Sequence, residues 1–247
     1  MGSDAGAVRD VDPSPAKAGL WEDFVDIFYT PSTVFARRSD GKFGLAMLFL
    51  VIAGVILFFL TKNAMAPIMD AEFARRSADM MRQNPNLTAE QLSTGRGFFE
   101  TFAPLIFAVT FPLTIVLVGI VLWGIGKLFD AKESLAVAIM VATYSQVPRL
   151  VQFLTNAAQG LLMDPDRMTS VNSVSFSIAR FMNADTAQPV LLALAGRVEL
   201  FTIWATVLLA IGLHVVGRIP KQSAGIAAAL TWLVGALPTV LAALRQG

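Results

Sequence analysis

Residues 143–149 read Thr-Tyr-Ser-Gln-Val-Pro-Arg and lie inside an apolar segment, residues 135–154, that is long enough to span a bilayer. A hydroxyl pair, an amide, a proline and a guanidinium therefore follow one another where lipid favours Leu, Val and Ala. Each polar group needs a partner from the protein, because bilayer hydrocarbon offers none. The other helices must supply these partners, so the stretch predicts a packed helical bundle inside a membrane.

The composition of the chain agrees with this interpretation. Of 247 residues, 55% are hydrophobic and 15% are charged, whereas soluble domains carry about 25% charged residues. The net charge of +1 and the lack of a basic block argue against nucleic acid as a partner. Because the chain has no cysteine, disulfides and thiolate zinc sites are excluded. The single histidine, His214, makes a Ser-His relay implausible. We expect no cofactor, no metal ion and no enzymatic activity.

Hydropathy predicts an all-α, polytopic membrane protein with five transmembrane helices. Residues 1–18 lack apolar periodicity and predict a disordered tail, and the capping-box pattern at Thr88 predicts a short helix in an ordered loop between the first two spans. The membrane domain covers residues 43–244, with spans at about 43–61, 102–125, 135–154, 189–216 and 224–244.

Residues 19–38 predict an amphipathic helical segment before the first span. Apolar side chains recur at helical spacing from Leu20 to Phe28, and Pro31 is placed to begin a second helix. The segment either lies at the membrane surface, with Trp21 and Tyr29 at headgroup level, or packs on the ends of the spanning helices. The residues that we assign to partner or membrane contact are Trp21, Asp23, Phe24, Asp26, Phe28, Tyr29 and Pro31.

Three charged residues fall inside the predicted spans at similar depth. Arg149 lies about 14 residues, or about 21 Å, into the third span, and Arg197 and Glu199 lie roughly 7 to 9 residues from the outer end of the fourth, antiparallel span. We predict that Glu199 pairs with Arg149, and that Arg197 reaches the outer interface or Gln152 and Tyr144. The whole predicted polar cluster is Tyr144, Ser145, Gln146, Pro148, Arg149, Arg197 and Glu199.

The polar cluster allows three interpretations. It could be a structural clamp between the third and fourth helices, a ligand or partner site at the proline kink, or a proton or ion path. A proton path is the least favoured, because acids are few and no chain of carboxylates crosses the predicted bilayer.

Two stretches resemble the Yip1-domain family of five-span membrane proteins. One comprises residues 21–24 (Trp-Glu-Asp-Phe), 28–31 (Phe-Tyr-Thr-Pro) and 34–38 (Val-Phe-Ala-Arg-Arg); the other is Tyr-Ser-Gln-Val-Pro at residues 144–148, similar to the family's Tyr-Ser-x-x-Pro. The resemblance implies a cytosolic N-terminus and five packed helices. Eukaryotic members act in Golgi and ER trafficking and associate with Rab GTPases and with one another.

The sequence also departs from the pattern of the eukaryotic members. Where they carry Asp-Leu-Tyr-Gly-Pro, residues 26–31 read Asp-Ile-Phe-Tyr-Thr-Pro, which is one residue longer and lacks the glycine. This argues against Rab binding and for a bacterial member in the inner membrane with a cytoplasmic N-terminus; a eukaryotic member would lie in the Golgi or ER membrane.

The leading functional hypothesis is a non-enzymatic adaptor or scaffold in membrane organisation or in trafficking-like processes. Its expected partners are the lipid bilayer, other membrane or membrane-associated proteins, and further copies of the chain. The alternative is a small-solute or ion transporter or channel that uses the polar third and fourth spans.

Overall fold

The computed structural model describes residues 19–164, 167–168 and 170–245, and over these residues it is helical with no named strand. The predicted tail, residues 1–18, lies outside the described residues. The helices are α1 (Leu20–Tyr29), α2 (Pro31–Arg37), α3 (Gly44–Gln83), α4 (Ala89–Lys127), α5 (Leu135–Tyr144), α6 (Pro148–Leu162), η2 (Val171–Val174), η3 (Ile178–Phe181), α7 (Pro189–Arg197), α8 (Leu200–Gly217) and α9 (Lys221–Leu244).

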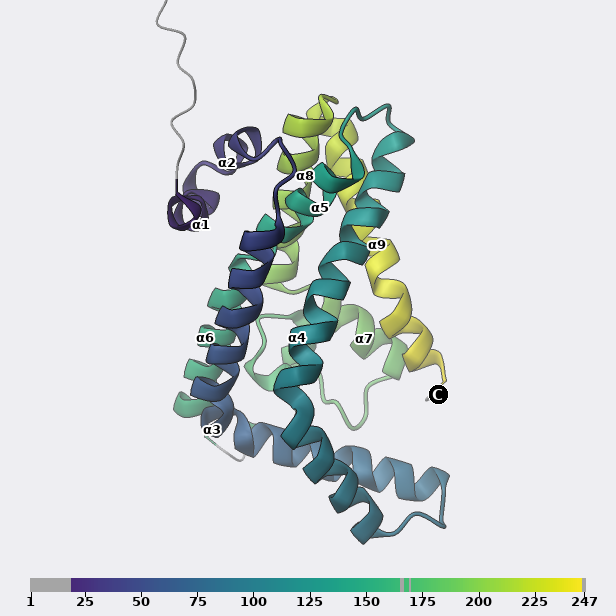
Figure 1. Cartoon of the computed structure of the whole chain (residues 1–247). Coiled ribbons are helices and arrows are strands. Elements are labelled where there is room, and N and C mark those ends of the chain that lie inside the picture. Colours follow the sequence, from purple (N-terminus) through teal and green to yellow (C-terminus); the bar gives the residue numbers. More distant parts are fainter. Residues whose placement is uncertain (1–18, 165–166, 169, 246–247) are drawn as a thin grey trace, which may run out of the picture.

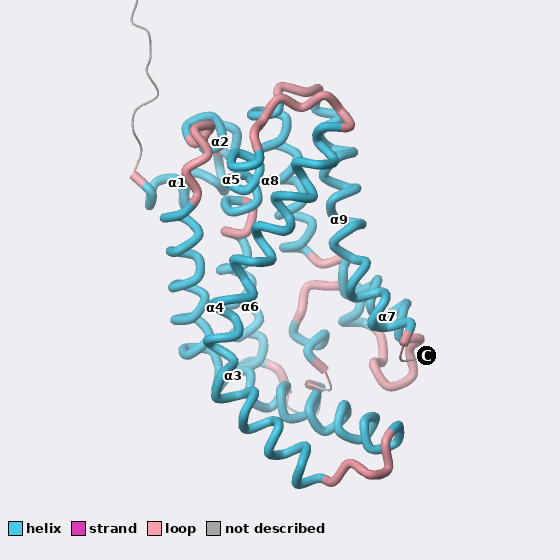
Figure 2. Tube along the Cα trace, turned by 45° about the vertical axis from the view of Figure 1, so that its right-hand side comes forward, coloured by secondary structure: helices cyan, strands magenta, loops and turns pink. Residues whose placement is uncertain are grey.

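Figure 1 shows a bundle in which α3, α4, α8 and α9 run along the long axis of the molecule. Among the described residues, these four helices are long and apolar enough to cross a membrane. The short helices α1 and α2 lie at one end, beside the start of α3. At the other end, the C-terminal part of α3 and the N-terminal part of α4 form a hairpin that extends beyond the bundle (Figure 2).

The hairpin forms because α3 ends, and α4 begins, well outside the spans predicted at residues 43–61 and 102–125. α3 continues through Pro67 as far as Gln83 and covers 40 residues. The predicted capping box forms: the Thr88 hydroxyl accepts from the Gln91 N–H at 3.2 Å, and the Gln91 side chain accepts from the Thr88 N–H at 3.0 Å. This cap begins the whole of α4, 39 residues, rather than the short helix that we predicted.

The prediction of one helix over residues 135–154 is wrong, because α5 ends at Tyr144 and α6 begins at Pro148. Proline has no N–H to donate, so one bond of the helical ladder is missing at Pro148, and here the first helix ends before it. Tighter bonds over three residues replace it: Val147 donates to the Tyr144 carbonyl at 3.2 Å, and Gln146 donates to the Thr143 carbonyl at 3.1 Å. α6 then runs beside α3 (Figure 1).

The predicted fourth span, residues 189–216, is also two helices, and only α8 is long and apolar enough to cross a membrane. The chain is extended at Glu199 (φ −129°, ψ 138°), between α7 and α8. The backbone there pairs with the preceding loop: Leu200 donates to the Phe176 carbonyl at 3.1 Å, and Ile178 donates to the Val198 carbonyl at 3.2 Å. This non-local pairing ends the helix, and the hydropathy of the segment does not reveal it.

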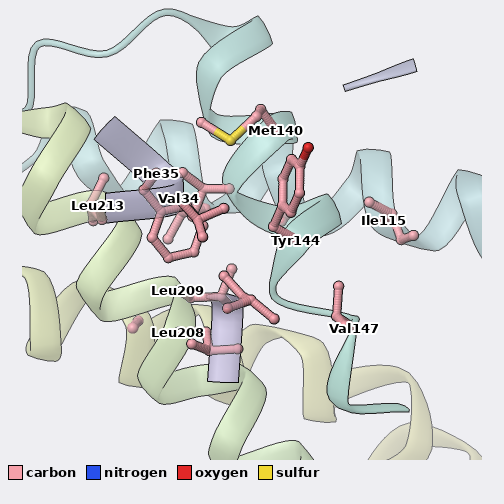
Figure 3. Close-up of a cluster of buried hydrophobic side chains, with 14 of the residues drawn as sticks. Val34, Phe35, Ile115, Met140, Tyr144, Val147, Leu208, Leu209 and Leu213 are labelled. Carbon is pink, nitrogen blue, oxygen red and sulfur yellow. The ribbon is translucent and has the colours of Figure 1, made fainter. Parts of the chain in front are cut away.

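The short helix α5 lies in the centre of the bundle. All of residues 138–144 are buried. The helices on either side approach α5 at glycines: a Cβ at Gly119 of α4 would lie 2.7 Å from the Ile139 Cα, and one at Gly212 of α8 would lie 2.4 Å from a Val141 methyl group. The polar stretch at residues 143–149 therefore begins inside this buried helix and continues through the break that follows it. Figure 3 shows part of this core, including Met140 and Tyr144.

Candidate functional site

The N-terminal segment, α1 and α2, docks onto the bundle through aromatic and aliphatic side chains. The Phe24 ring stacks on Phe49 of α3 with a centroid distance of 4.5 Å, and Phe28 meets Trp204 of α8 edge-on at 5.3 Å. Ile27 of α1 is fully buried. Phe35 of α2 is equally buried and lies in the core cluster of Figure 3. The N-terminal segment therefore packs against α3 and α8.

A buried ion-pair network holds α1 against the residues that follow α2. The Asp23 side chain is fully buried, and its Oδ2 lies 2.5 Å from an Arg38 guanidinium nitrogen. Arg37 lies 3.4 Å from Asp23 Oδ1 and also pairs with Asp26. Tyr144 of α5 is close enough to Asp23 and Arg38 for both to act on it electrostatically. Asp23 and Asp26 of α1 thus pair with the two arginines at the end of α2.

The outer face of α1 presents a different set of side chains. Trp21, Val25 and Tyr29 are spaced four residues apart, so they lie on one side of the helix, and they are 68%, 45% and 81% exposed. We call these three residues the outer stripe. Of the predicted contact residues, Trp21 and Tyr29 belong to it. Val25 was missed, although its spacing from both aromatics could have identified it.

The other predicted contact residues face the protein to varying degrees. Asp23 and Phe24 are buried, whereas Asp26, Phe28 and Pro31 are half-buried. These side chains hold the segment in place and leave the outer stripe as its accessible apolar surface. The edge of Trp21 also contacts Phe49 of α3, with a centroid distance of 6.0 Å, so the outer stripe begins next to a helix that can cross a membrane.

The predicted ion pair between Arg149 and Glu199 does not form. The Arg149 guanidinium instead donates to two side-chain oxygens near it in sequence, Gln146 Oε1 at 2.7 Å and Gln152 Oε1 at 3.1 Å. Glu199 caps α8: its carboxylate accepts from the Phe201 N–H at 3.1 Å and from the Thr202 N–H at 2.8 Å. Groups within one helical turn therefore supply the hydrogen-bond partners of both side chains. The predicted pairing depended on depth in the membrane alone and left these local partners out.

The side-chain contacts of Arg197 contradict one of its two predicted arrangements. It reaches neither Gln152 nor Tyr144; it donates to the Trp232 carbonyl of α9 at 3.3 Å, and its guanidinium lies 5.8 Å from the centre of the Trp232 ring. A guanidinium so placed gains from the negative face of the indole ring. Arg197 thereby connects the end of α7 to the middle of α9.

The rest of the predicted polar cluster surrounds the break between α5 and α6. The Ser145 hydroxyl donates to the Val141 carbonyl at 2.8 Å, and Tyr144, Ser145, Gln146 and Pro148 are all buried. The structure thus brings five of the seven cluster residues together at one break. Glu199 lies at the second break, and Arg197 lies just before it.

A buried carboxylate that the sequence did not indicate lies at the end of the bundle near α2. Glu133, in the loop between α4 and α5, has both oxygens buried without a hydrogen-bond partner among the described residues, and Lys127 Nζ lies 4.0 Å from Oε1. Burial raises the pKa of this carboxyl, and nearby Lys127 only partly opposes that effect. A single glutamate in a short charged loop gives no signal in the sequence.

The described part of the chain contains no group of three or more His, Cys, Asp or Glu residues that could hold a metal ion. The chain matches no curated protein and no solved structure. The model of the Yip1 domain family matches residues 25–242, which is most of the chain; the match includes residues 28–31, 34–38 and 144–148 of the two stretches that carry the resemblance. The chain is an integral membrane protein that belongs to the Yip1 domain family.

Proposed function

We propose that the protein is a non-enzymatic adaptor, which holds another membrane or membrane-associated protein at the end of its helical bundle. The proposed contact surface is the outer stripe on α1. The partner that fits it is a protein with a complementary apolar surface at the membrane boundary.

The observation that carries this proposal is the fixed position of an exposed aromatic surface. Large apolar side chains that stay exposed on a well-packed element are typical of interaction surfaces, and Trp and Tyr are enriched where binding energy concentrates. α1 is anchored by Phe24 and Ile27 and by the buried Asp23 pairs. The stripe is therefore presented in one orientation before any partner arrives, which lowers the entropy cost of binding.

The test is co-purification from native membranes in mild detergent. One variant replaces the outer stripe (Trp21→Ser, Val25→Ser and Tyr29→Ser). A control variant replaces three apolar residues elsewhere that are more exposed than the stripe as a set (Leu161→Ser, Leu162→Ser and Phe181→Ser). We expect a stoichiometric partner with the native chain and with the control variant, and its loss with the stripe variant. The proposal is wrong if the native chain purifies alone, or if both variants keep the same partner.

A second candidate, a small-solute or ion transporter, is favoured by the two helix breaks. Interrupted helices with polar groups at the breaks form the substrate sites of many transporters, and here Arg149 and Glu199 lie next to such breaks. Flux into liposomes that stops with Arg149→Ala, in a variant that still folds, would support this candidate. A broad screen that finds no flux would count against it.

A further inference from the structure

A groove of about 500 Å³ lies between α2 and the C-terminal half of α8, next to the start of α9. Ala210, Ile211 and Val215 of α8 contribute apolar side chains to its lining, and Ser32 and Lys221 contribute a hydroxyl and an ammonium group. A groove of this size is within the range of small-molecule and lipid sites. Nothing in the proposed adaptor function uses it.

The apolar part of the groove continues into an exposed apolar surface of α8. Ile203, Val207 and Ile211 are spaced four residues apart on this candidate membrane span, so they form one stripe along it. Ile203 and Val207 are exposed, and Ile211 lines the groove. A hydrocarbon chain in the bilayer can therefore lie along this stripe and enter the groove without crossing a polar surface.

The polar part of the groove lies at the end of α8, a candidate membrane span, and favours an anion. Lys221 is the first residue of α9 and directly follows the turn from α8. Its ammonium is exposed and forms no ion pair with any residue that the structure describes. The lining contains no carboxylate, so the charge of the groove is positive.

His214 adds a hydrogen-bonding ring nitrogen to the groove. Its Nδ1 lies 2.6 Å from the Ile219 carbonyl oxygen. Since a carbonyl only accepts, this Nδ1 carries the hydrogen, and Nε2 is left as an acceptor in the neutral ring. A hydroxyl of a glycerol headgroup can donate to that nitrogen.

We propose that this groove binds one anionic glycerophospholipid. One acyl chain lies along Ile203, Val207 and Ile211. The phosphate lies at Lys221 and the Ser32 hydroxyl, and the headgroup reaches His214. The apolar stripe selects a lipid over a soluble anion, and the unpaired ammonium selects an anionic headgroup over a zwitterionic one.

The test is native mass spectrometry of the full chain in mild detergent, with phosphatidylglycerol and phosphatidylcholine of identical acyl chains as the two probes. Lys221→Gln removes the ammonium from the groove. Lys132→Gln removes an exposed ammonium from the loop before α5 and is the matched control. Ala210→Leu narrows the apolar floor without a change in charge. Melting temperatures in detergent verify that each variant folds.

We expect the native chain to prefer phosphatidylglycerol. Lys221→Gln should weaken phosphatidylglycerol binding about fivefold, the effect expected for one cation near an anionic surface, and leave phosphatidylcholine unchanged. Lys132→Gln should behave as the native chain, and Ala210→Leu should weaken both lipids. The proposal is overturned if the native chain has no preference, if the two lysine variants weaken binding equally, or if Ala210→Leu has no effect.

Discussion

Arg38 binds the fully buried carboxylate of Asp23 through two nitrogens: Nη2 and Nε each lie 2.5 Å from Asp23 Oδ2. Asp23 lies on α1, and Arg38 follows α2, so this pair closes the N-terminal segment into one unit. Breaking a buried ion pair costs more than an exposed pair contributes, because the remaining charge stays desolvated. The position of the outer stripe therefore depends on this contact.

Asp23→Asn should loosen the N-terminal segment. The substitution removes the buried carboxylate charge that Arg37 and Arg38 share, and we expect a loss of about 3 kcal/mol in the free energy of unfolding. Hydrogen exchange over α1 and α2 should accelerate more than exchange over α8. Asp40→Asn is the control, because Asp40 pairs with Lys42 at an exposed site, where such a pair contributes about 0–1 kcal/mol. Equal effects of the two variants would contradict this account.

Gly119→Ala should destabilise the bundle. The new methyl group would lie 2.7 Å from the Ile139 Cα, so α4 and α5 would have to separate. Overpacking of this kind costs about 1–3 kcal/mol. Gly124→Ala, on the same helix, meets nothing within 4 Å and should be neutral or slightly stabilising, because alanine favours helix. Thermal unfolding in detergent measures both, and a Gly119→Ala protein as stable as Gly124→Ala would show that the helices do not touch here.

Glu133 should make stability depend on pH. Because burial raises its pKa in the folded protein above the ordinary value of 4.5, the folded state holds the proton more tightly than the unfolded chain. The stability that the folded state gains from this bound proton is fully present below pH 4.5 and is lost as the pH rises through the folded pKa. Glu133→Gln should therefore melt at a higher temperature than the native chain at neutral pH, with a difference that shrinks as the pH falls towards 4.5.

The control for this prediction is Glu90→Gln, because Glu90 is exposed. Its melting temperature should differ from that of the native chain by the same small amount at every pH. If the Glu133→Gln difference is equally flat, the carboxylate is not penalised by burial.

Glu199→Ala should weaken the start of α8. Its carboxylate accepts from Phe201 N–H and from both the N–H and the hydroxyl of Thr202, and loss of such a cap costs about 0.5–2 kcal/mol. Glu199→Gln retains one side-chain oxygen as an acceptor and should lose less. Unfolding in detergent ranks the variants; an equal loss in both would mean that the charge of Glu199, and not its capping bonds, stabilises the protein.

Local signals in the sequence predicted much of the fold. The helical class, the start of α2 at Pro31 and the capping box at Thr88 each depend on a few neighbouring residues. The break at Glu199 could not be predicted this way, because it depends on backbone pairing with Phe176, which comes from a loop. Pro148 did indicate a distortion, but the proline alone does not tell a kink from a complete break.

The candidate site was predicted less completely, for physical reasons. Asp23 and Phe24 were both assigned to partner or membrane contact, but both side chains are buried against the protein. Asp23 pairs with Arg38, which lies one helix later, so the local pattern does not reveal this partner. Arg149 and Glu199 were predicted to pair because their positions along the predicted spans place them at one depth. Acceptors nearer in sequence, such as Gln146, satisfy the guanidinium at a smaller entropy cost.

The most direct test of the adaptor account is photo-crosslinking in native membranes, with a benzophenone amino acid at Tyr29 on the outer stripe. The control position is Ala36, which is exposed on α2. The account predicts one discrete protein adduct from Tyr29 and none from Ala36. Adducts with lipid alone at Tyr29, or the same protein adducts at both positions, would contradict it.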